Sequence, residues 1–359
     1  MSVNNHKVAL SRWYMDTERL TATRTDLPLV DTLQWSDQKT VKSFYHLSDR
    51  HMSLASYLLK YLFIHRACHV PWNQIKISRT PDPHRRPCYI PLDSSRGGNQ
   101  GNSDAPATPK IEFNVSHQAS LVALAGCTIP PSLDNSHDDA NHHQQRDPAS
   151  AAAVPQIGID ITCTDERERR NPNSILSTEE ELLSFIDIFT TAFSPREIAI
   201  MKAYPVEDAT SGYREDATDT AADRLKKSID YRIRRFYTYW ALKEAYIKMV
   251  GEGLLADWLQ ELEFFNVVPP APVSGAEEWG NPKTDVTVRL YGRIVEDVRV
   301  EVVAFGERYI LATASRGDGF GKPDPSNAKP MAEWCDFRCM DIERDIQMCA
   351  RGECECLDQ

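Results

Sequence analysis

The sequence has little of what membrane-spanning, secreted and nucleic-acid-binding proteins need. No apolar run in the 359-residue chain approaches the roughly 20 residues that cross a bilayer, and residues 1–7 lack the apolar core of a leader peptide. The chain has 41 basic and 52 acidic side chains, a formal net charge of −11, whereas nucleic-acid binders present a dominant basic surface. We therefore expect a soluble cytoplasmic protein with no nucleic-acid or membrane partner, which meets anionic ligands with a local basic patch.

The nine cysteines include no C-x-x-C pair, and nothing indicates a secretory context, so we expect reduced thiols rather than a disulfide framework. Five of them fall in the last 25 residues: Cys335, Cys339, Cys349, Cys354 and Cys356. Their intervals match no ordinary structural zinc module, which makes zinc the weaker interpretation. Apolar and cysteine positions from Cys335 to Cys349 recur at steps of four and three, which instead predicts a helix over residues 330–351 with cysteines as small core residues.

Four segments have the composition of solvated linkers: residues 93–109, 131–155, 206–223 and 316–329. They divide the chain into an N-terminal half (1–155), a C-terminal half (156–316) and a tail (317–359). Each half contains a long amphipathic helix and several strand-like runs, which predicts two α/β halves followed by a helical extension. No exact sequence repeat is present, so the pairing of halves depends on element order alone.

Local patterns assign the elements that carry the polar motifs. A helix begins at Ser48, and a second, over residues 228–250, ends at Gly251. Two further helices are predicted from capping boxes at Ser177 with Glu180 and at Ser194 with Glu197. Strands are predicted at residues 75–78, 111–125, 156–162, 262–268, 286–291, 298–305 and 309–314.

Two segments of the C-terminal half carry acidic and basic groups suited to chemistry. In residues 158–162, Asp160 emerges from an apolar strand beside a glycine, which permits close approach of another group. In residues 240–248, Glu244 and Lys248 stand four apart on one helix face. Alone, the aspartate fits a turn former and the helix pair fits a surface ion pair. Bulky neighbours favour a helix that is buried on more than one face.

A third segment, residues 113–117, ends in Ser116-His117. Adjacent side chains of a strand point to opposite faces, so we discount a serine nucleophile paired with a histidine base. His117 is then either a hydrogen-bonded loop residue or a phosphate ligand beside a small hydroxyl donor.

The three segments, in this order, resemble the signatures of the Sfp-type 4′-phosphopantetheinyl transferases: F-N-x-S-H, G-[IV]-D and W-x-x-K-E-[AS]-x-x-K. Weaker matches are the helix that leads to Ser53, the Arg86-Pro87 turn, and Gly-x-Gly-Leu at residues 251–254. The resemblance covers about residues 35–314 and extends to the larger, broad-range members of the family.

This resemblance implies two similar α/β halves related by pseudo-twofold symmetry, with coenzyme A in the cleft between them. The implied reaction transfers 4′-phosphopantetheine from coenzyme A to a serine of an apo carrier protein and releases adenosine 3′,5′-bisphosphate. Asp160 and Glu244 would hold Mg²⁺, and Lys248 would stabilise charge on the leaving group. Either Glu244 or a metal-bound water would accept the serine proton.

The resemblance also implies a set of residues that bind coenzyme A. His117 and Ser53 match positions at the 3′-phosphate, whereas Arg86 and Ser116 match positions nearer the adenine. Lys39 and Lys42 would add positive charge. Many bacterial members have a second acid where this chain has Thr162, which leaves two protein carboxylates for the metal.

The implied partners are acyl and peptidyl carriers of fatty-acid, polyketide and nonribosomal-peptide synthases, and a lysine-pathway reductase. We expect a monomer. One hypothesis is that Arg232, Arg234 and Arg235 form a docking surface for an acidic carrier, and the alternative, which the pattern favours, is an ordinary solvated helix face. Two alternatives remain: a non-catalytic scaffold that binds coenzyme A, and a metal-dependent phosphohydrolase.

Overall fold

The computed structural model describes residues 9–80, 86–91, 109–129, 154–206, 213–275, 279–317, 319–321 and 332–357. The chain forms two compact units. The first unit comprises Met1–Ile157 together with Arg316–Gln359, and the second comprises Gly158–Ser315. The predicted linkers 93–109 and 131–155 lie almost wholly outside the described residues, as does most of 316–329.

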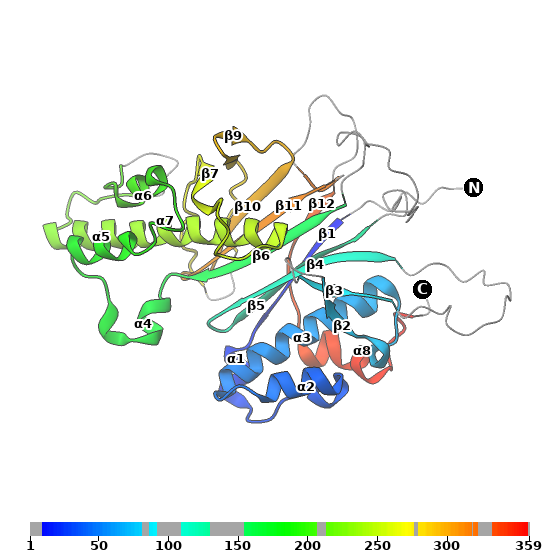
Figure 1. Ribbon diagram of the computed structural model, residues 1–359. Coiled ribbons are helices and arrows are strands. Elements are labelled where there is room, and N and C mark those ends of the chain that lie inside the picture. The colour runs from blue at the N-terminus through cyan, green and yellow to red at the C-terminus, as the bar shows by residue number, and fades with distance from the viewer. Residues whose placement is uncertain are drawn as a thin grey trace, which may run out of the picture. The chain divides into compact units, whose positions relative to one another are not determined.

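The first unit is built on a four-stranded sheet in the order β12-β1-β5-β4 (Figure 1). The strands are β1 (Ala9–Asp16), β4 (Lys110–Gln118), β5 (Leu121–Ile129) and β12 (Glu333–Cys339). β4 and β5 form an antiparallel hairpin in which Ser116 lies opposite Ala123. β1 is antiparallel to β5 on one side and parallel to β12 on the other.

Helix α3 (Leu47–Cys68) packs on this sheet against β4 and β5. Its buried positions include Leu54, Leu58 and Leu62, the apolar face that the sequence predicts. Contact is close, because a Cβ placed on Gly126 of β5 would lie 2.5 Å from the ring of Phe63. Smaller elements complete the unit: α1 (Glu18–Thr23), η1 (Val30–Thr32), α2 (Trp35–Lys42), η2 (Trp72–Gln74), β2 (Ile77–Arg79) and β3 (Pro87–Tyr89).

The tail is not the single helix expected over residues 330–351. It forms strand β12, a π-helical turn η7 (Ile342–Ile346) and the short helix α8 (Gln347–Arg351). The spacing of cysteines and isoleucines fits a helix, but the aromatic residues of β12 have high strand propensity and β1 offers an unpaired edge. Arg12 of β1 donates a 2.7 Å hydrogen bond to the carbonyl oxygen of Cys335 and stacks 4.5 Å from the centre of the Phe337 ring.

The second unit combines helix α7 (Ala221–Val250) with a sheet in the order β10-β11-β6. Its strands are β6 (Gln156–Cys163), β10 (Val298–Phe305) and β11 (Tyr309–Arg316), and a smaller sheet contains β7 (Leu262–Phe265), β8 (Thr287–Leu290) and β9 (Arg293–Ile294). Short helices α4 (Glu166–Arg170), η5 (Pro172–Ser174), α5 (Glu179–Asp187), α6 (Pro195–Lys202) and η6 (Leu259–Glu261) complete it.

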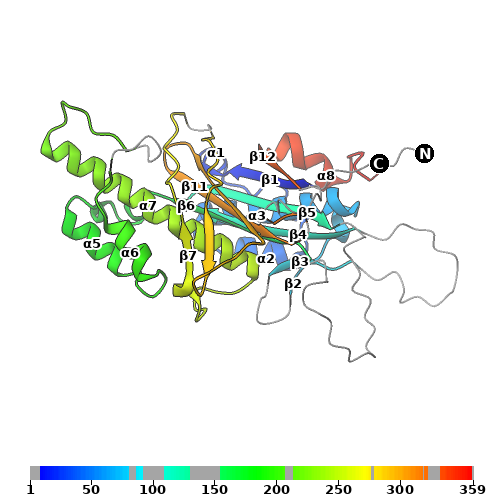
Figure 2. The same ribbon diagram turned by 90° about the horizontal axis from the view of Figure 1, so that it is seen from above.

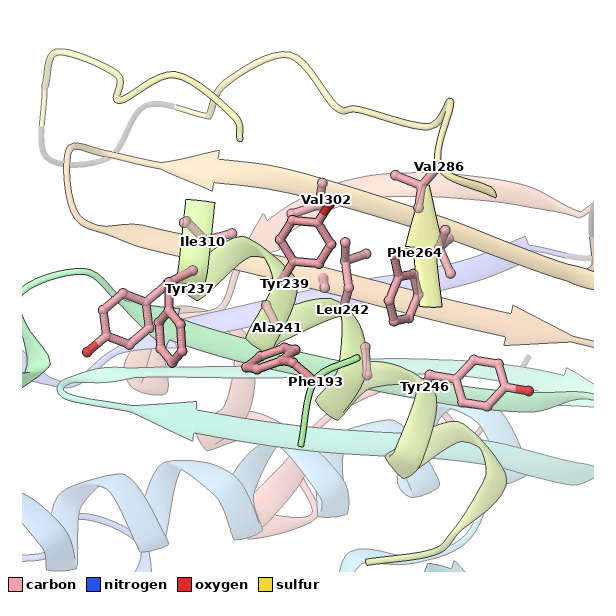
Figure 3. Close-up of a cluster of buried hydrophobic side chains, with 14 of the residues drawn as sticks. Phe193, Tyr237, Tyr239, Ala241, Leu242, Tyr246, Phe264, Val286, Val302 and Ile310 are labelled. Carbon is pink, nitrogen blue, oxygen red and sulfur yellow. The ribbon is translucent and has the colours of Figure 1, made fainter. Parts of the chain in front are cut away.

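Aromatic and aliphatic side chains of α7 form the centre of the second unit (Figure 3). Tyr239 and Leu242 of the helix lie among Phe264 of β7 and Val302 of β10, and all four are nearly inaccessible to solvent. The helix is apolar on more than one face, as its bulky residues predict. Burial on this scale fixes α7 against the sheet and gives its polar residues defined positions.

Two predicted helix starts differ from the structure. The capping box of α5 is formed by Thr178 with Glu181, one residue beyond the predicted pair, because Thr178 has the extended backbone that an N-cap needs. α7 begins at Ala221, seven residues before the predicted start at 228, and its capping box is formed by Thr220 with Asp223. The sequence interpretation missed this box because it falls in the segment that was assigned to a linker by its composition. The box at Ser194 and the left-handed Gly251 cap are confirmed.

Both units are therefore mixed α/β, each with a long helix against a sheet, which confirms the predicted class of two α/β halves. Figure 2 shows the same two pairings, α3 with β4 and β5, and α7 with β6. In the described part of the chain, no helix is both long enough and apolar enough to cross a membrane.

Candidate active site

Strand β6 and helix α7 touch backbone to backbone at Gly158. A Cβ built at this position would lie 2.0 Å from the carbonyl oxygen of Ala245 and 2.5 Å from the amide nitrogen of Met249. Only glycine fits such an approach, because both neighbouring atoms belong to the helix backbone. The glycine of the G-I-D segment thereby holds Asp160, two residues along the strand, against the polar side of α7.

Asp160 and Lys248 form an ion pair across this contact. The Lys248 ammonium donates to the Asp160 carboxylate at 2.6 Å, and the aspartate residue is only 5% exposed. A buried carboxylate requires a charged partner or metal, so Lys248 compensates part of its desolvation. The predicted strand acid and helix base are thus brought together.

Glu244 lies one turn before Lys248 on the same side of α7. Its Oε1 atom is buried and has no hydrogen-bond partner among the described residues. Burial and, to a lesser extent, the nearby Asp160 charge raise the pKa of Glu244 to about 7, against the opposing effect of Lys248. A buried carboxylate oxygen without a partner, beside a second carboxylate, favours the binding of a cation.

Asp160 and Glu244 offer hard oxygen ligands of the kind that Mg²⁺ prefers. Such sites use one or two protein carboxylates and leave the remaining positions to water and substrate phosphates. The side chains therefore fit a magnesium ion, and a bound cation would satisfy the orphaned Glu244 oxygen.

Thr162, two residues beyond Asp160 on β6, makes two backbone contacts through its side chain. Its hydroxyl lies 3.3 Å from the carbonyl oxygens of both Tyr237 and Ile310, to which it donates. Tyr237 precedes Glu244 by seven residues, about two helical turns or roughly 10 Å along the helix axis. Thr162 thus joins β6 to α7 and β11 at a distance from Glu244.

Lys243 is a structural residue of the site that the sequence reasoning missed. Its ammonium lies 2.9 Å from Glu197 and donates to the carbonyl oxygens of Leu259 and Leu262 at 2.8 and 2.6 Å. Glu197 also accepts the backbone amide of Phe264 at 3.0 Å. These contacts fix the rotation of α7 about its axis, and so the direction in which Glu244 points. A lysine inside an apolar stretch of helix was the available signal.

The predicted residues for binding coenzyme A, apart from Lys248, belong to the first unit. Ser116 is buried and His117 exposed, so the two adjacent residues occupy opposite faces of β4, as expected. Arg86 forms an ion pair with Glu112 and donates to the carbonyl oxygen of Ile157 at 3.1 Å. Burial, together with the nearby charge of Arg316, lowers the pKa of Arg86 to about 10.

Three further candidates lie on helices of this unit. Ser53 is half-buried on α3. Lys39 and Lys42 are exposed on α2, the first with its ammonium 5.5 Å from the centre of the Trp35 ring, the second donating to Gln38 at 3.4 Å. Both lysines are thus accessible to an anionic ligand.

The predicted arginine docking surface is wrong for two of its three members. Arg232 is fully buried and donates to Glu179 at 2.6 Å, and Arg234 is 6% exposed and donates to the carbonyl oxygens of Pro270 and Glu307. Arg235 is half-buried and donates to the carbonyl oxygens of Ile200 and Ala203. The three arginines fall within one helical turn, but α5 and α6 contact Arg232 and Arg235. The segments at Pro270 and Glu307 contact Arg234.

Comparison with known proteins agrees with the motifs along almost the whole chain. A family profile described as 4′-phosphopantetheinyl transferase, N-terminal matches residues 21–129, and one described as the 4′-phosphopantetheinyl transferase superfamily matches residues 156–312. The chain is 51% identical to 4′-phosphopantetheinyl transferase A of Aspergillus fumigatus, over 99% of this chain and 98% of that protein.

Two further relatives extend the comparison. 4′-Phosphopantetheinyl transferase NpgA of Emericella nidulans is 49% identical over 97% of this chain and 96% of its own length. A more distant human protein, the L-aminoadipate-semialdehyde dehydrogenase-phosphopantetheinyl transferase, is 23% identical over 66% of this chain and 53% of its own length.

Proposed function

The chain belongs to the 4′-phosphopantetheinyl transferase superfamily, and from this premise we propose that Asp160 and Glu244 together hold Mg²⁺ against the pyrophosphate of coenzyme A. The observation that carries the proposal is the buried, unpartnered Oε1 atom of Glu244 beside a second buried carboxylate. When bound, the metal would supply positive charge that neutralises the pyrophosphate and favours departure of the bisphosphate.

Lys248 is the residue best suited to meet charge that develops on the leaving group. Its side chain is 27% exposed, and its ammonium lies 2.6 Å from the carboxylate of Asp160. An ammonium has three hydrogen-bond donors and a full positive charge, which suit it to a phosphate oxygen. We assign it electrostatic stabilisation of the leaving bisphosphate.

Glu244 is suited to a second task, removal of the proton from the attacking carrier serine. Its pKa, raised to about 7 by burial, matches that of a general base near neutral pH. Metal coordination lowers the basicity of a carboxylate. The assignment therefore requires that one oxygen of Glu244 bind the metal and the other accept the proton.

For the 3′-phosphate end of coenzyme A we propose His117 and Ser53, with Arg86 and Ser116 nearer the adenine and Lys39 and Lys42 as peripheral charge. His117 is exposed on β4 and so accessible to a ligand. The Arg86 guanidinium is engaged by Glu112, which orients it but also reduces its net charge toward a phosphate.

Carrier choice is proposed from the family. The relatives' names include both general 4′-phosphopantetheinyl transferases and one that acts with L-aminoadipate-semialdehyde dehydrogenase. We propose a broad-range enzyme, cytoplasmic and monomeric, that serves fatty-acid, polyketide and nonribosomal-peptide carriers and the lysine-pathway reductase. Because one chain contains both matched family segments, a second copy is not needed to supply either.

The test is incubation of the full chain with coenzyme A, Mg²⁺ and purified apo carriers of each class, followed by intact-protein mass spectrometry. We expect each accepted carrier to gain one phosphopantetheinyl group, and this gain to disappear in Asp160→Asn. If no carrier class gained this mass, the result would contradict the transferase and favour the non-catalytic scaffold. Release of the bisphosphate without a carrier would indicate a phosphohydrolase.

A further inference from the structure

Three cysteines of the tail and one histidine of α3 meet in the first unit, and none of the four has a role assigned above. The Nδ1 or Nε2 of His65 and the Sγ atoms of Cys349, Cys354 and Cys356 all lie within 4.8 Å of one another. His65 and Cys349 are buried, and the other two are half-buried. Four groups that ligate transition metals thus surround one point.

The fold of the tail produces this convergence. Helix α8 ends at Gly352, which has a φ of 73° and donates from its amide to the carbonyl oxygen of Cys349 at 3.2 Å. The amide of Glu353 donates to the carbonyl oxygen of Met348 at 2.8 Å, so the chain reverses as in a Schellman motif. The reversal brings Cys354 and Cys356 back to Cys349. The Sγ atoms of Cys349 and Cys356 lie 3.7 Å apart.

His65 is oriented to complete the group. Its Nδ1 lies 2.7 Å from the carbonyl oxygen of Val70, a contact that requires the proton to be on Nδ1. Nε2 then carries a free lone pair and lies 3.1 Å from the Sγ of Cys354. Zinc-bound histidines are held in this way, with the second ring nitrogen donating to a carbonyl or carboxylate.

We propose that His65, Cys349, Cys354 and Cys356 form a structural zinc site. Tetrahedral Zn²⁺ with Zn–S bonds of about 2.3 Å places its sulfur ligands roughly 3.8 Å apart, close to the observed 3.7 Å between Cys349 and Cys356. Four protein ligands leave no open position, which is typical of a structural rather than a catalytic site. The thiol protons pass to solvent when the metal binds.

The surroundings of the site suit this centre better than a disulfide. Zinc with three thiolates and one imidazole has a net charge of about −1, and Arg66 lies close enough to Cys349 to interact with it electrostatically. A disulfide would use two sulfurs and leave the third thiol beside the lone pair of His65. All the cysteines of the described chain are free thiols in the structure.

The site would fasten the tail to α3. The ring Nδ1 of His69, just beyond the helix, lies 2.9 Å from the carbonyl oxygen of Cys356 and gives a second link at the same place. Residues 289 positions apart in sequence, His65 and Cys354, are thereby joined. Local cysteine spacing did not reveal zinc because one ligand comes from the other end of the chain.

The test measures metal directly and does not depend on transferase activity. The full chain is expressed with zinc, purified with a reductant and without chelator, and analysed by elemental mass spectrometry. We expect about one zinc ion per chain, lost in Cys354→Ser and His65→Gln but retained in Cys339→Ser, an exposed cysteine outside the cluster. Asp160→Asn should also retain zinc, which separates this site from the proposed magnesium site.

Two measurements on the unmodified chain remain decisive if a variant fails to fold. Refolding with Co²⁺ should give the visible bands of a tetrahedral site and a sulfur-to-cobalt charge-transfer band. Removal of zinc should make the exposed Arg351 more susceptible to trypsin. Purified protein without zinc that does not take up cobalt, or a mass lower by two hydrogens with a mapped disulfide between Cys349 and Cys356, would overturn the proposal.

Discussion

Lys243 and Glu197 form an ion pair of 2.9 Å in which neither side chain is more than 3% exposed. Lys243 lies next to Glu244 in the sequence, but its side chain points toward α6 and β7. A buried pair of this kind contributes chiefly to the uniqueness of packing, because desolvation offsets most of its attraction.

Removal of one partner leaves a buried charge, so Lys243→Met should lower the free energy of unfolding by about 3–5 kcal/mol. Urea denaturation measures the change. Lys226→Met provides the matched control, because Lys226 pairs with Asp230 at 2.7 Å on the exposed face of the same helix. We expect its effect to stay below about 1 kcal/mol. Equal losses in the two variants would contradict the assignment.

Substitution at Gly158 tests the close contact of β6 with α7. Gly158→Ala should destabilise the protein by at least about 3 kcal/mol, since the methyl group would meet helix backbone rather than a mobile side chain. Gly253→Ala should change stability by less than about 0.5 kcal/mol, because nothing lies within 4 Å of a Cβ there. Thermal unfolding compares the two, and a stable Gly158→Ala protein would refute the geometry.

Glu244→Gln should separate stability from activity. Without metal at pH 8 the wild-type carboxylate is largely ionised in a buried site, because its pKa is about 7. The amide removes that charge, so the variant should melt at a higher temperature while losing at least about 10²-fold in transfer rate. Addition of Mg²⁺ should stabilise the wild type but not the variant. A magnesium response that survives in Glu244→Gln would argue against this ligand.

His117→Ala tests the proposed contact with the 3′-phosphate. The Michaelis constant for coenzyme A should rise by about 10-fold, as expected for loss of one hydrogen bond to a charged group, whereas that for 3′-dephospho-coenzyme A should stay unchanged. Steady-state kinetics with both donors makes the comparison. If both constants rise equally, His117 acts elsewhere.

Lys60 provides a test of pH dependence outside the active site. Burial on α3 lowers its pKa from 10.5 to about 8, with Arg79 adding to the effect and Asp37 opposing it. Between these values Lys60 binds more protons in the unfolded chain than in the native one, so its own contribution to stability should rise with pH from 8 to 10.5.

Lys60→Met should remove that rise and add roughly 1–3 kcal/mol at neutral pH. Chemical denaturation at several pH values checks both effects. The ammonium of Lys60 lies 3.9 Å from the centre of the Tyr57 ring, and loss of this contact will reduce the gain. The same dependence of stability on pH in the wild type and in Lys60→Met between pH 8 and 10.5 would contradict the prediction.

The sequence predicted the elements whose cause is local. The strand over residues 298–305 and the capping box at Ser194 follow from alternation and from side-chain geometry within a few residues, and both are confirmed. It also predicted that Asp160 of the strand and Lys248 of the helix lie together, and the structure places them 2.6 Å apart. Whether Glu244 and Asp160 bind magnesium remains a prediction.

The failures arose where a distant partner decides the outcome. Residues 333–339 have a pattern that a helix also satisfies, and only the free edge of β1 makes them a strand. Arg232 and Arg234 were interpreted as solvated because their partners, the carboxylate of Glu179 and the carbonyl oxygen of Pro270, are distant in the sequence. Likewise, no cysteine spacing within the tail indicates a histidine on α3.

The parallel pairing of β1 with β12 has a consequence for how the protein is made. Arg12 and Cys335, which contact each other across this pair, are separated by 323 residues. At translation rates of about 5–20 residues per second, roughly 15–65 s elapse between synthesis of the two strands. During that time the second unit has emerged complete, while the nascent first unit exposes one edge of β1 to chaperones and to other chains. We expect maturation of the enzyme to be limited by this final strand addition.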